Sequence, residues 1–473
     1  MNSELTNVPT GWVRTSFGAV VELEYGKGLR RDARDVTGSV PVYGSNGIVG
    51  YHSVPLTTAS SIIVGRKGAI GAVHLATVPC WPIDTTYYVF SPNGIDISFL
   101  YYLLGNCNLG SLDKSTAIPG LNRDDVYRMS ILFPPLPEQH RIVAKIEELF
   151  TRLDAGVEAL KKIKSQLRRY RQAVLKHAFE GKLTAVWRQA HNNELKPASV
   201  LLERIKQERL KRAKGKYKEL SPLDTADLSD LPEGWVWARV GEIGLVETGN
   251  TPSKSQAAYY GRDYNFYKPT DLNAGYYTRE SEDGLSSEGI KKARLLPERS
   301  ILITCIGATI GKTGFIRQRG ASNQQINAII PDRNMLPEFL YFICISPQFQ
   351  NGILSNASAT TLPILSKRKF EVLELPLCPI LEQHQAVEEI ERRFSVADQI
   401  ERTVDHSLKQ AERLRHSILK RAFEGKLVPQ DPNDEPAEKL LERIRQGRAR
   451  QQAERKPAKS SRSKSNTKQM RLV

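Results

Sequence analysis

Cysteine is scarce in this sequence, which has five cysteines scattered over 473 residues. They stand at Cys80, Cys107, Cys305, Cys344 and Cys378, and no two are spaced as C-x-x-C. An odd number of cysteines without such a pair fits neither a disulfide framework nor a zinc site. We therefore expect reduced thiols in the core and no metal site.

Long hydrophobic runs are missing as well. The most apolar stretch, residues 300–307, is too short and too interrupted to span a bilayer, and no basic segment with an apolar core opens the chain. The sequence therefore predicts a cytoplasmic protein that does not contact membranes. With 40% hydrophobic residues, the chain still has ample apolar side chains for well-packed cores.

Catalytic signatures are also lacking. Residues 307–313 resemble a phosphate-binding loop, but the pattern G-x-x-x-x-G-K-[ST] needs glycine at position 306, where the chain has Ile306. We find no H-E-x-x-H, no glycine-rich nucleotide fingerprint after a strand and no Asn/Asp-Pro-Pro-aromatic tetrad for amino methylation. The sequence predicts a binding protein with no catalytic residues and no cofactor of its own.

Positive charge is in excess. The chain has 68 Lys and Arg against 52 Asp and Glu, a formal net charge of +16. This balance indicates a polyanionic partner, with simple solubility as the alternative. Residues 448–473 carry nine cations and one acid (9 − 1 = +8) and few apolar side chains, so we expect this tail to be disordered.

The sequence repeats itself. Residues 136–140 return at 380–384 and residues 178–183 return at 422–427, both at an offset of 244 (382 − 138 and 422 − 178). Gly-Trp-Val recurs at an offset of 223 (234 − 11), and an aromatic segment recurs at 240 (340 − 100). The long repeat predicts two homologous domains with two homologous connectors in a pseudo-two-fold molecule. The growing offset places insertions in the second domain, around residues 251–289.

Each half opens with a predicted globular domain of mixed structure. Runs rich in β-branched and aromatic residues, separated by glycine and asparagine, predict strands at 20–24, 40–43, 61–64 and 87–90. Helices are predicted at 99–103 and, in the second half, at 339–343. We expect two α+β domains with one topology, over residues 1–136 and 231–380.

A long amphipathic helix follows each domain. Apolar residues recur at steps of three and four from Ile142 to Val174 and again from Val387 to Ile418, and no proline lies between Glu138 and Phe179. We expect helices within 137–183 and 381–427, the first roughly 60 Å long at 1.5 Å per residue. Their narrow apolar seams favour pairing as an antiparallel coiled coil.

The remaining segments, 184–230 and 428–473, are charged connectors. Each contains a short amphipathic helix that begins at Pro197 or Pro436. Two interpretations stay open for these helices. They could dock a partner, or they could pack back on the coiled coil.

Glycine-rich segments occupy equivalent places in the two halves, at residues 65–71 and 307–311. A shared turn between strands explains both, because glycine accepts positive φ values and lets the backbone approach a phosphate closely. Arg66, Lys67 and Lys312 supply cations beside these turns. A purely structural turn and a loop that contacts DNA both remain open.

The combination of motifs resembles the specificity subunits of bacterial type I restriction-modification systems. The resemblance covers about residues 8–445 and rests on Pro-x-Gly-Trp near the start of each half, the glycine-rich turns, and the P-P-L-x-E-Q and A-F-x-G-K-L segments. A Pro-Gly-Leu-like segment at 119–121 also belongs to the pattern, although the second half has Pro363-Ile364 in its place.

This resemblance implies the function and the partners. Each of two target-recognition domains, separated by the two helices, would read one half of a bipartite asymmetric site in double-stranded DNA. Two adenine methyltransferase subunits and two motor nuclease subunits would be the protein partners. S-adenosylmethionine, ATP and magnesium are implied for those partners and not for this chain.

DNA-reading residues should be polar or cationic side chains on loops, because phosphate contacts fix the register and base-edge contacts carry the sequence information. Divergent loops on a shared scaffold suggest different ligands for the two domains. The candidates are Lys27, Arg30, Arg31, Ser45, Asn46, Arg66, Lys67 and Lys114 in the first domain, and Lys254, Lys268, Arg294, Lys312, Asn323, Gln324 and Gln325 in the second.

Three other functions compete with this interpretation. The chain could be a coiled-coil DNA-binding adaptor outside a restriction system. An NTP-dependent enzyme would need residues 307–313 to bind phosphate, which a nucleotide-binding assay tests. A coiled-coil structural protein would show no affinity for DNA at low salt.

Overall fold

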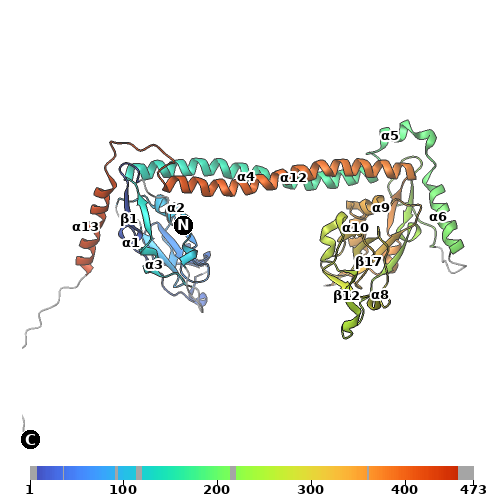
Figure 1. The fold of residues 1–473 in the computed structure, drawn as a ribbon, viewed down its shortest axis with the longest axis horizontal. Coiled ribbons are helices and arrows are strands. Elements are labelled where there is room, and N and C mark those ends of the chain that lie inside the picture. Colours follow the sequence, from blue (N-terminus) through green and yellow to red (C-terminus); the bar gives the residue numbers. More distant parts are fainter. Residues whose placement is uncertain are drawn as a thin grey trace, which may run out of the picture. The chain divides into compact units, whose positions relative to one another are not determined.

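A computed structural model of the chain describes residues 8–35, 37–90, 94–112, 120–212, 220–358 and 362–455. It divides into two compact units, which we call unit 1 (Met1–Leu160 with His406–Val473) and unit 2 (Lys161–Asp405). Each unit holds one globular domain and part of each of the two long helices, α4 (Leu136–Phe179) and α12 (Ile380–Phe423) (Figure 1). Unit 1 is therefore built from both ends of the sequence.

The domain of unit 1 is α+β. β1 (Val13–Ser16) pairs with β9 (Ser130–Phe133), and an antiparallel sheet has the order β2 (Glu24–Tyr25), β8 (Thr86–Phe90), β5 (Ser61–Gly65), β6 (Val73–Ala76). A second sheet has the order β4 (Gly47–His52), β3 (Val40–Gly44), β7 (Trp81–Pro82), with β3 and β7 parallel. The helices are α1 (Phe17–Val20), η1 (Arg31–Ala33), α2 (Ile97–Asn106), η2 (Leu109–Leu112) and α3 (Arg123–Tyr127).

The domain of unit 2 repeats this topology. β10 (Val236–Arg239) pairs with β18 (Glu374–Leu377), and the two sheets have the orders β11 (Gly244–Thr248), β17 (Ile326–Pro331), β14 (Ile301–Thr304), β15 (Thr313–Phe315) and β13 (Asp283–Leu285), β12 (Tyr260–Tyr267), β16 (Gly320–Ser322). The helices are α7 (Val240–Ile243), η4 (Ala257–Tyr259), η5 (Asp271–Tyr277), α8 (Ser287–Ile290), α9 (Pro337–Cys344), α10 (Pro347–Asn356) and α11 (Lys367–Glu371). The predicted pair of homologous α+β domains is confirmed.

The extra residues of the second domain lie where the offsets placed them. The offset is 223 at the end of β2 and β11 (248 − 25) and 240 at the start of β5 and β14 (301 − 61). The segment between β11 and β14 contains η4, η5 and α8. The prediction of insertions around residues 251–289 is confirmed.

Strand predictions succeeded where a run is buried on both faces and failed at the start of the chain. Every residue of β5 is buried, as are those of β14. The strand predicted at 20–24 is wrong, because Phe17 and Val20 fill the core from one face of the short helix α1, and β2 has only two residues. Val20 and Val21 are β-branched and therefore favoured a strand over the helical turn of α1 that ends at Val20.

The two long helices pair antiparallel within each unit. In unit 2, Arg171 Nη2 lies 2.6 Å from Asp398 Oδ1, and Lys164 Nζ lies 2.7 Å from Asp405 Oδ1. In unit 1, Arg415 pairs with Asp154. The residue numbers of each pair add to 569 (171 + 398, 164 + 405, 154 + 415), so residues advance in opposite directions in one register. The predicted antiparallel coiled coil is confirmed.

The apolar stripe on the helices is wider than the seam between them. Leu167 and Val404 are buried in unit 2, but Ile163 is 37% exposed and Tyr170 is 41% exposed. Leu414 in unit 1 is 51% exposed. Two helices alone shield only a narrow seam, so part of the periodic pattern stays on the surface.

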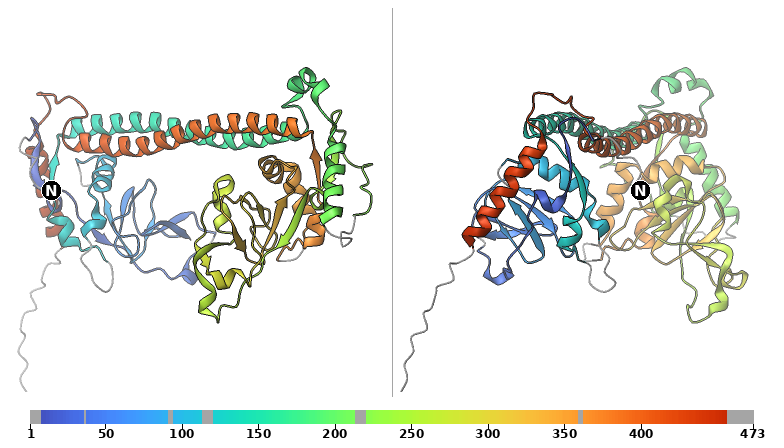
Figure 2. Two further views of the ribbon diagram at one scale, coloured as in Figure 1. Left: turned by 45° about the vertical axis from the view of Figure 1, so that its right-hand side comes forward. Right: turned by 60° about the vertical axis from the view of Figure 1, so that its left-hand side comes forward.

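The connector helices belong to the cores of the units. After the short α5 (Ala185–Ala190) and η3 (Asn192–Glu194), α6 (Ala198–Arg212) packs on the domain of unit 2, and α13 (Ala437–Arg455) packs on the domain of unit 1 (Figure 2). Leu201 and Ile205 of α6 are buried in one core; Leu440 and Ile444 of α13 are buried in the other. These apolar faces are therefore covered within the units. The interpretation that the helices pack back on the coiled coil is corrected, because they pack chiefly on the globular domains. Docking of a partner by these helices stays a prediction.

The first part of the predicted tail is helical. Arg448, where disorder was predicted to start, lies in α13 and donates from Nη1 to the carbonyl oxygen of Gly18 at 2.8 Å. Burial lowers the pKa of its guanidinium. The prediction is wrong for residues 448–455. The apolar face of α13 packs in the core of unit 1, and the same helix continues through these residues to Arg455. Residues 456–473 lie outside the described residues.

The cysteines behave as predicted. Cys80, Cys305, Cys344 and Cys378 are buried free thiols, and Cys107 is partly buried. Within the described ranges, no helix combines the length and apolarity needed to cross a membrane.

Candidate nucleic-acid interface

The repeated Glu-Gln pairs join each domain to the long helices. Trp12 Nε1 donates to Glu138 Oε2 at 2.8 Å, and Gln430 Nε2 donates to Glu138 Oε1 at 3.1 Å. In unit 2, Trp235 Nε1 donates to Glu382 Oε2 at 2.9 Å. Burial raises the pKa of Glu138. These carboxylates satisfy buried donors, and their role is structural.

The glutamine of each pair bridges backbone groups. Gln139 accepts from the Asp96 amide at 3.1 Å and donates to the Pro134 carbonyl at 3.1 Å. Gln383 accepts from the Leu336 amide at 3.1 Å and donates to the Cys378 carbonyl at 3.0 Å. The two copies therefore perform the same task, which accounts for their repetition in the sequence.

The segments at the start of each half pack on the end of a long helix from the other half. A Cβ on Gly425 would lie 2.5 Å from Pro9 Cγ, and a Cβ on Gly181 would lie 2.4 Å from Pro232 Cγ. Both glycines have positive φ, +69° and +67°. Because only glycine combines this conformation with so close an approach, the Pro-x-Gly-Trp and A-F-x-G-K-L motifs form one joint in each unit.

Several loops of unit 1 meet at one place, which we call corner 1. It consists of the end of β2, the β3–β4, β5–β6 and β7–β8 turns and the start of α3. The amides of Arg66 and Lys67 donate to the Thr85 carbonyl at 2.9 and 3.1 Å, and the Leu121 amide donates to the Arg66 carbonyl at 2.9 Å. A Cβ on Gly68 would lie 3.2 Å from Ser45 Oγ.

Unit 2 has an equivalent corner 2, made by the end of β11 and the β14–β15 and β16–β17 turns. The Gly249 amide donates to the Ile326 carbonyl at 2.9 Å, just as the Gly26 amide donates to the Thr86 carbonyl at 3.1 Å in corner 1. The Cys305 amide donates to the Gln325 carbonyl at 2.7 Å. Equivalent backbone bonds show that the two corners occupy the same place on the repeated scaffold.

The glycine-rich segments are tight turns between paired strands. Gly68 and Gly71 have φ of +80° and +73°, and Gly307 and Gly311 have φ of +96° and +86°. A Cβ on Gly71 would lie 2.4 Å from the Gly110 nitrogen. The prediction of a shared turn is confirmed, and residues 307–313 join two strands instead of leading into a helix as a phosphate-binding loop does.

Corner 1 gathers five of the candidate DNA-binding residues, which are Lys27, Ser45, Asn46, Arg66 and Lys67. Lys27, Asn46 and Lys67 are exposed, and the Lys27 amide is fixed by the Pro82 carbonyl at 3.0 Å. Arg30 and Arg31 lie apart from these turns, exposed at the start of η1. Lys114 lies outside the described residues.

Corner 2 gathers amide side chains. Thr251 Oγ1 donates to Gln324 Oε1 at 2.6 Å, and Asn323 Nδ2 donates to Gln325 Oε1 at 3.0 Å. The Arg294 backbone amide donates to Asn250 Oδ1 at 3.1 Å, which brings Arg294 to the same loop. Asn323, Gln324, Gln325 and Arg294 are thus brought together.

The other candidates of unit 2 differ in their surroundings. Lys254 is exposed in the loop after β11, and Lys312 is half-buried at the end of the β14–β15 turn. Lys268 is ion-paired with Asp283, so its charge is neutralised within the domain.

Sequence reasoning missed four polar or aromatic residues of the corners. They are Tyr25 and Arg123 in corner 1, and Asn250 and Thr251 in corner 2. The repeat offers a signal, since Tyr25 and Thr248 are equivalent at the offset of 223 (248 − 25), and Asn250 and Thr251 lie two and three residues after Thr248.

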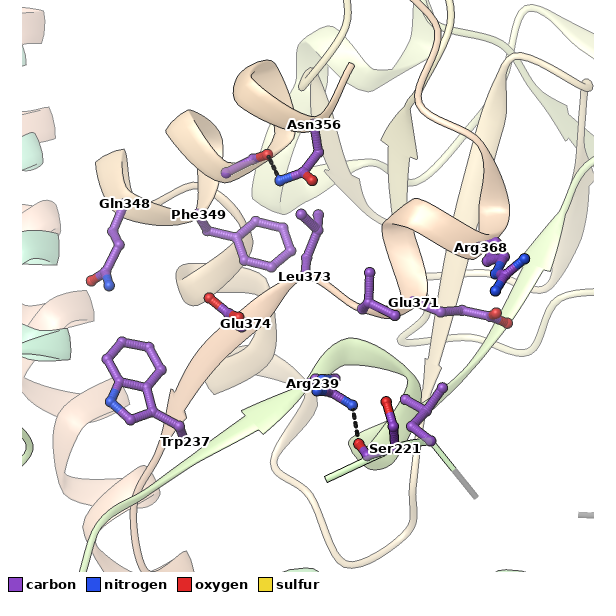
Figure 3. Close-up of a pocket in the computed structure, with 13 residues that line it drawn as sticks. Ser221, Trp237, Arg239, Gln348, Phe349, Asn356, Arg368, Glu371, Leu373 and Glu374 are labelled. Atoms are coloured by element: carbon purple, nitrogen blue, oxygen red, sulfur yellow. Dashed lines mark hydrogen bonds between the residues drawn. The ribbon is translucent and has the colours of Figure 1, made fainter. Parts of the chain in front are cut away.

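A cavity of about 810 Å³ opens in unit 2 between α10, α11 and β10 (Figure 3). Trp237 and Phe349 line it together with the opposite charges of Arg368 and Glu371. The guanidinium of Arg239 donates to the Ser221 carbonyl at 2.5 Å. No histidine or cysteine is among its lining residues. The described residues also contain no cluster of three or more His, Cys, Asp or Glu that could hold a metal ion.

Each unit also has a cavity beside its long helices, and the two cavities have equivalent linings. We call them the helix clefts. The cleft of unit 1, about 760 Å³, lies between α2 and the long helices and is lined by Tyr102, Glu147, Phe150 and Asp154, among others. The cleft of unit 2, about 900 Å³, is lined by the equivalent residues Phe342, Glu391, Phe394 and Asp398. The three long-helix residues match at the offset of 244 (391 − 147, 394 − 150, 398 − 154).

Comparison with known proteins gives one consistent result. The family model "Type I restriction modification DNA specificity domain" matches residues 9–169 and 232–410. The chain is 26% identical over 453 residues to the Type I restriction enzyme EcoDI specificity subunit of Escherichia coli, covering 93% of this chain and 96% of that protein. It is 25% identical to the EcoBI specificity subunit of the same species, covering 94% of both.

A solved chain from a type I R-M system has a similar fold. The TM-score is 0.60 at 18% sequence identity, and the match covers 89% of this chain and 99% of the other.

Proposed function

The chain belongs to the family of type I restriction modification DNA specificity domains, and from this premise we propose that it is the DNA-recognition subunit of a type I restriction-modification complex. Each unit would read one half of a bipartite, asymmetric site in double-stranded DNA. The observation that carries this proposal is the pair of corners, which share a backbone and differ in side chains. A shared backbone positions loops against a groove, and the side chains select the bases.

The candidate DNA-binding residues of this proposal are the side chains at the corners. Cationic Lys27, Arg66 and Lys67 in corner 1 suit contacts to phosphate and guanine. Asn323, Gln324 and Gln325 in corner 2 suit bidentate contacts to adenine. Different bases in the two half-sites are therefore expected.

Catalysis is assigned to partner subunits. The buried carboxylates that recur in the sequence, Glu138 and Glu382, accept hydrogen bonds from Trp12 and Trp235, which supports a structural task for them. S-adenosylmethionine is proposed to bind the methyltransferase partners, and ATP and magnesium the motor nuclease partners.

Two methyltransferase subunits are proposed to bind, one at each helix cleft. Two surfaces with equivalent side chains can bind two copies of the same subunit. Glu147, Phe150 and Asp154 of one cleft correspond to Glu391, Phe394 and Asp398 of the other. Two motor nuclease subunits are proposed to complete the complex for restriction.

The test is methylation by reconstituted components. We expect the chain, co-expressed with its methyltransferase partner in a host without other adenine methylation, to direct methylation to one bipartite sequence, which mapping of genomic methylated adenines would reveal. Exchange of residues 231–380 for the equivalent domain of a relative should change one half-site only. The purified chain with S-adenosylmethionine alone should transfer no methyl group.

Two outcomes would contradict the proposal. Methyl transfer by the chain alone would make it an enzyme. Specific DNA binding without any methylation in the presence of the partner would favour the alternative, a coiled-coil DNA-binding adaptor outside a restriction system.

A further inference from the structure

Corner 1 contains two arginines held against one exposed aromatic ring. The Arg66 Cζ lies 5.4 Å from the centroid of the Tyr25 ring, and the Arg123 Cζ lies 5.5 Å from the same centroid. Tyr25 is 53% exposed, and both arginines are half-buried. Residues from β2, the β5–β6 turn and α3, which are far apart in the sequence, therefore bring two guanidinium groups against one exposed ring.

The position of this cluster is fixed by a ring of contacts. Tyr25 and Tyr87 pack edge to face with centroids 5.0 Å apart, and Tyr87 Oη donates to the Leu121 carbonyl at 3.0 Å. The Leu121 amide donates to the Arg66 carbonyl, and Arg66 Nη2 donates to the Asp84 carbonyl at 2.7 Å. The side chains are thus ordered before any ligand arrives, which lowers the entropy cost of binding.

Neither arginine has an acidic partner among the ion pairs of the described residues. Arg66 uses only a carbonyl, and the Nε atoms of both Arg66 and Arg123 are buried without a hydrogen-bond partner. A cation–π contact at an exposed ring contributes less than an unpaired buried N–H group costs. Buried N–H groups of this kind call for a partner, which water, an ion or a ligand can supply.

The chemistry favours a ligand that carries formal negative charge. Each guanidinium is positively charged and matches phosphate with paired N–H donors. A guanine edge is neutral and takes one arginine in a bidentate contact. Two arginines held on one ring thus suit a phosphate better than a base.

We propose that Arg66 and Arg123, held against Tyr25, form a two-arginine site for a backbone phosphate of the DNA half-site that unit 1 reads. This inference rests on the proposed function and deepens it. The site anchors the DNA without reading its sequence, and the neighbouring Lys27, Ser45 and Asn46 are left to contact bases.

The test compares the salt dependence of binding for variants of the complete complex. The probe is a duplex with the bipartite site defined by methylation mapping, and the complex contains the full chain and its methyltransferase partner. Each phosphate contact contributes about 0.9 to the slope of log affinity against log salt. We expect Arg66→Gln and Arg123→Gln each to lower the slope by about 0.9, with the methylated sequence unchanged.

Matched variants control for charge and folding. Arg128→Gln removes an exposed cation from the same unit, one that is paired with Asp125, and should leave the slope unchanged. Lys367→Gln alters the equivalent position in unit 2, where the lysine pairs with Glu371, and should also have no effect. Arg66→Lys keeps a charge without the planar fork and should retain the slope at reduced affinity.

Several outcomes would overturn the inference. Unchanged slopes for Arg66→Gln and Arg123→Gln would show that no phosphate is bound there, and a changed methylated base would show that these arginines read sequence. If the wild-type complex itself fails to bind or methylate specifically, the proposed function fails instead.

Discussion

The two corners share a backbone, but unit 2 lacks the arrangement of Tyr25, Arg66 and Arg123 found in corner 1. Where corner 1 pairs Tyr25 with Tyr87, the equivalent strands of unit 2 pair Thr248 with Asn327, and Thr248 Oγ1 donates to Asn327 Oδ1 at 2.7 Å. The equivalent of Arg66 is Cys305 at an offset of 239 (305 − 66), because the Leu121 amide donates to the Arg66 carbonyl and the Leu365 amide donates to the Cys305 carbonyl. The equivalent of Arg123 is Lys367 at an offset of 244 (367 − 123).

This difference separates what the scaffold does from what the loops do. The turns keep their hydrogen bonds in both units, because those bonds hold the strands together. The side chains that project from the turns are not needed for the strands, so they are free to differ. We expect unit 1 to bind DNA with a larger electrostatic contribution than unit 2.

The largest effect is expected where the two units are alike. Trp12→Ala should destabilise unit 1 by about 3–5 kcal/mol, because it removes a buried indole and leaves Glu138 without a donor. Trp235→Ala should do the same to unit 2. Hydrogen exchange followed by mass spectrometry would measure protection of each unit separately.

Trp187→Ala is the matched control, since Trp187 stacks on His191 near the surface of unit 2. A loss below about 1 kcal/mol is expected there. Equal loss of protection in both units after Trp12→Ala would show that the units do not unfold separately. That result would contradict the expectation that only unit 1 is destabilised.

A second prediction concerns the helix clefts, where the units present the same residues. Glu147→Lys should weaken the binding of one methyltransferase subunit, and Glu391→Lys the binding of the other. Each loss of binding free energy should be about 2–5 kcal/mol if the carboxylate is paired in the complex. Native mass spectrometry should give complexes with one methyltransferase for each single variant and none for the double variant.

Glu412→Lys places the same charge change on an exposed residue of α12 outside the cleft and should leave both copies bound. Retention of two copies by the double variant Glu147→Lys/Glu391→Lys would mean that the repeated clefts are not the binding surfaces.

The third prediction tests the corners where they differ. Asn323→Ala and Gln324→Ala in corner 2 should relax one half-site, with a loss of about 1–3 kcal/mol of discrimination at the affected base. Mapping of methylated adenines should show the other half-site unchanged. Gln348→Ala, an exposed amide at the cavity of Figure 3, is the control and should not alter the sequence.

A change in the half-site of unit 1 after Asn323→Ala would sink the assignment of one corner to one half-site. So would a uniform loss of affinity for all sequences, because that is the behaviour of a phosphate contact.

The smallest effect is expected in the coiled coil. Arg171 lies 2.6 Å from Asp398 and 2.8 Å from Glu401, whereas Arg415 pairs with Asp154 in unit 1. Because exposed ion pairs contribute little, Arg171→Ala should cost about 1 kcal/mol and Arg415→Ala less. Urea unfolding at low and high salt would detect the difference, and a larger cost for Arg415→Ala would reverse the ranking.

Local patterns in the sequence were sufficient for the main elements. The apolar period between Ile142 and Val174 and the lack of proline determined a long helix, because nothing else buries such a stripe so continuously. β5 and β14 were recognisable because strands buried on both faces appear in the sequence as uninterrupted apolar runs. Repetition of motifs along the chain showed that one topology occurs twice. The strand predicted at 20–24 was wrong, since the four residues of α1 before it are too few for a helical period to appear.

Only the tertiary structure decided which segments complete each unit and which side chains meet. The covering of unit 1 by α13 depends on packing between residues hundreds of positions apart, such as the Ala437 amide that donates to the Gly11 carbonyl at 2.9 Å. In unit 2, α6 is anchored nearer in sequence, where the Ala198 amide donates to the Gly234 carbonyl at 2.8 Å. The meeting of Tyr25, Arg66 and Arg123 brings together β2, the β5–β6 turn and α3, which are separated along the chain by several strands and turns. A sequence records the identity of such residues, but their proximity arises from the closing of strands and turns, which no local pattern contains.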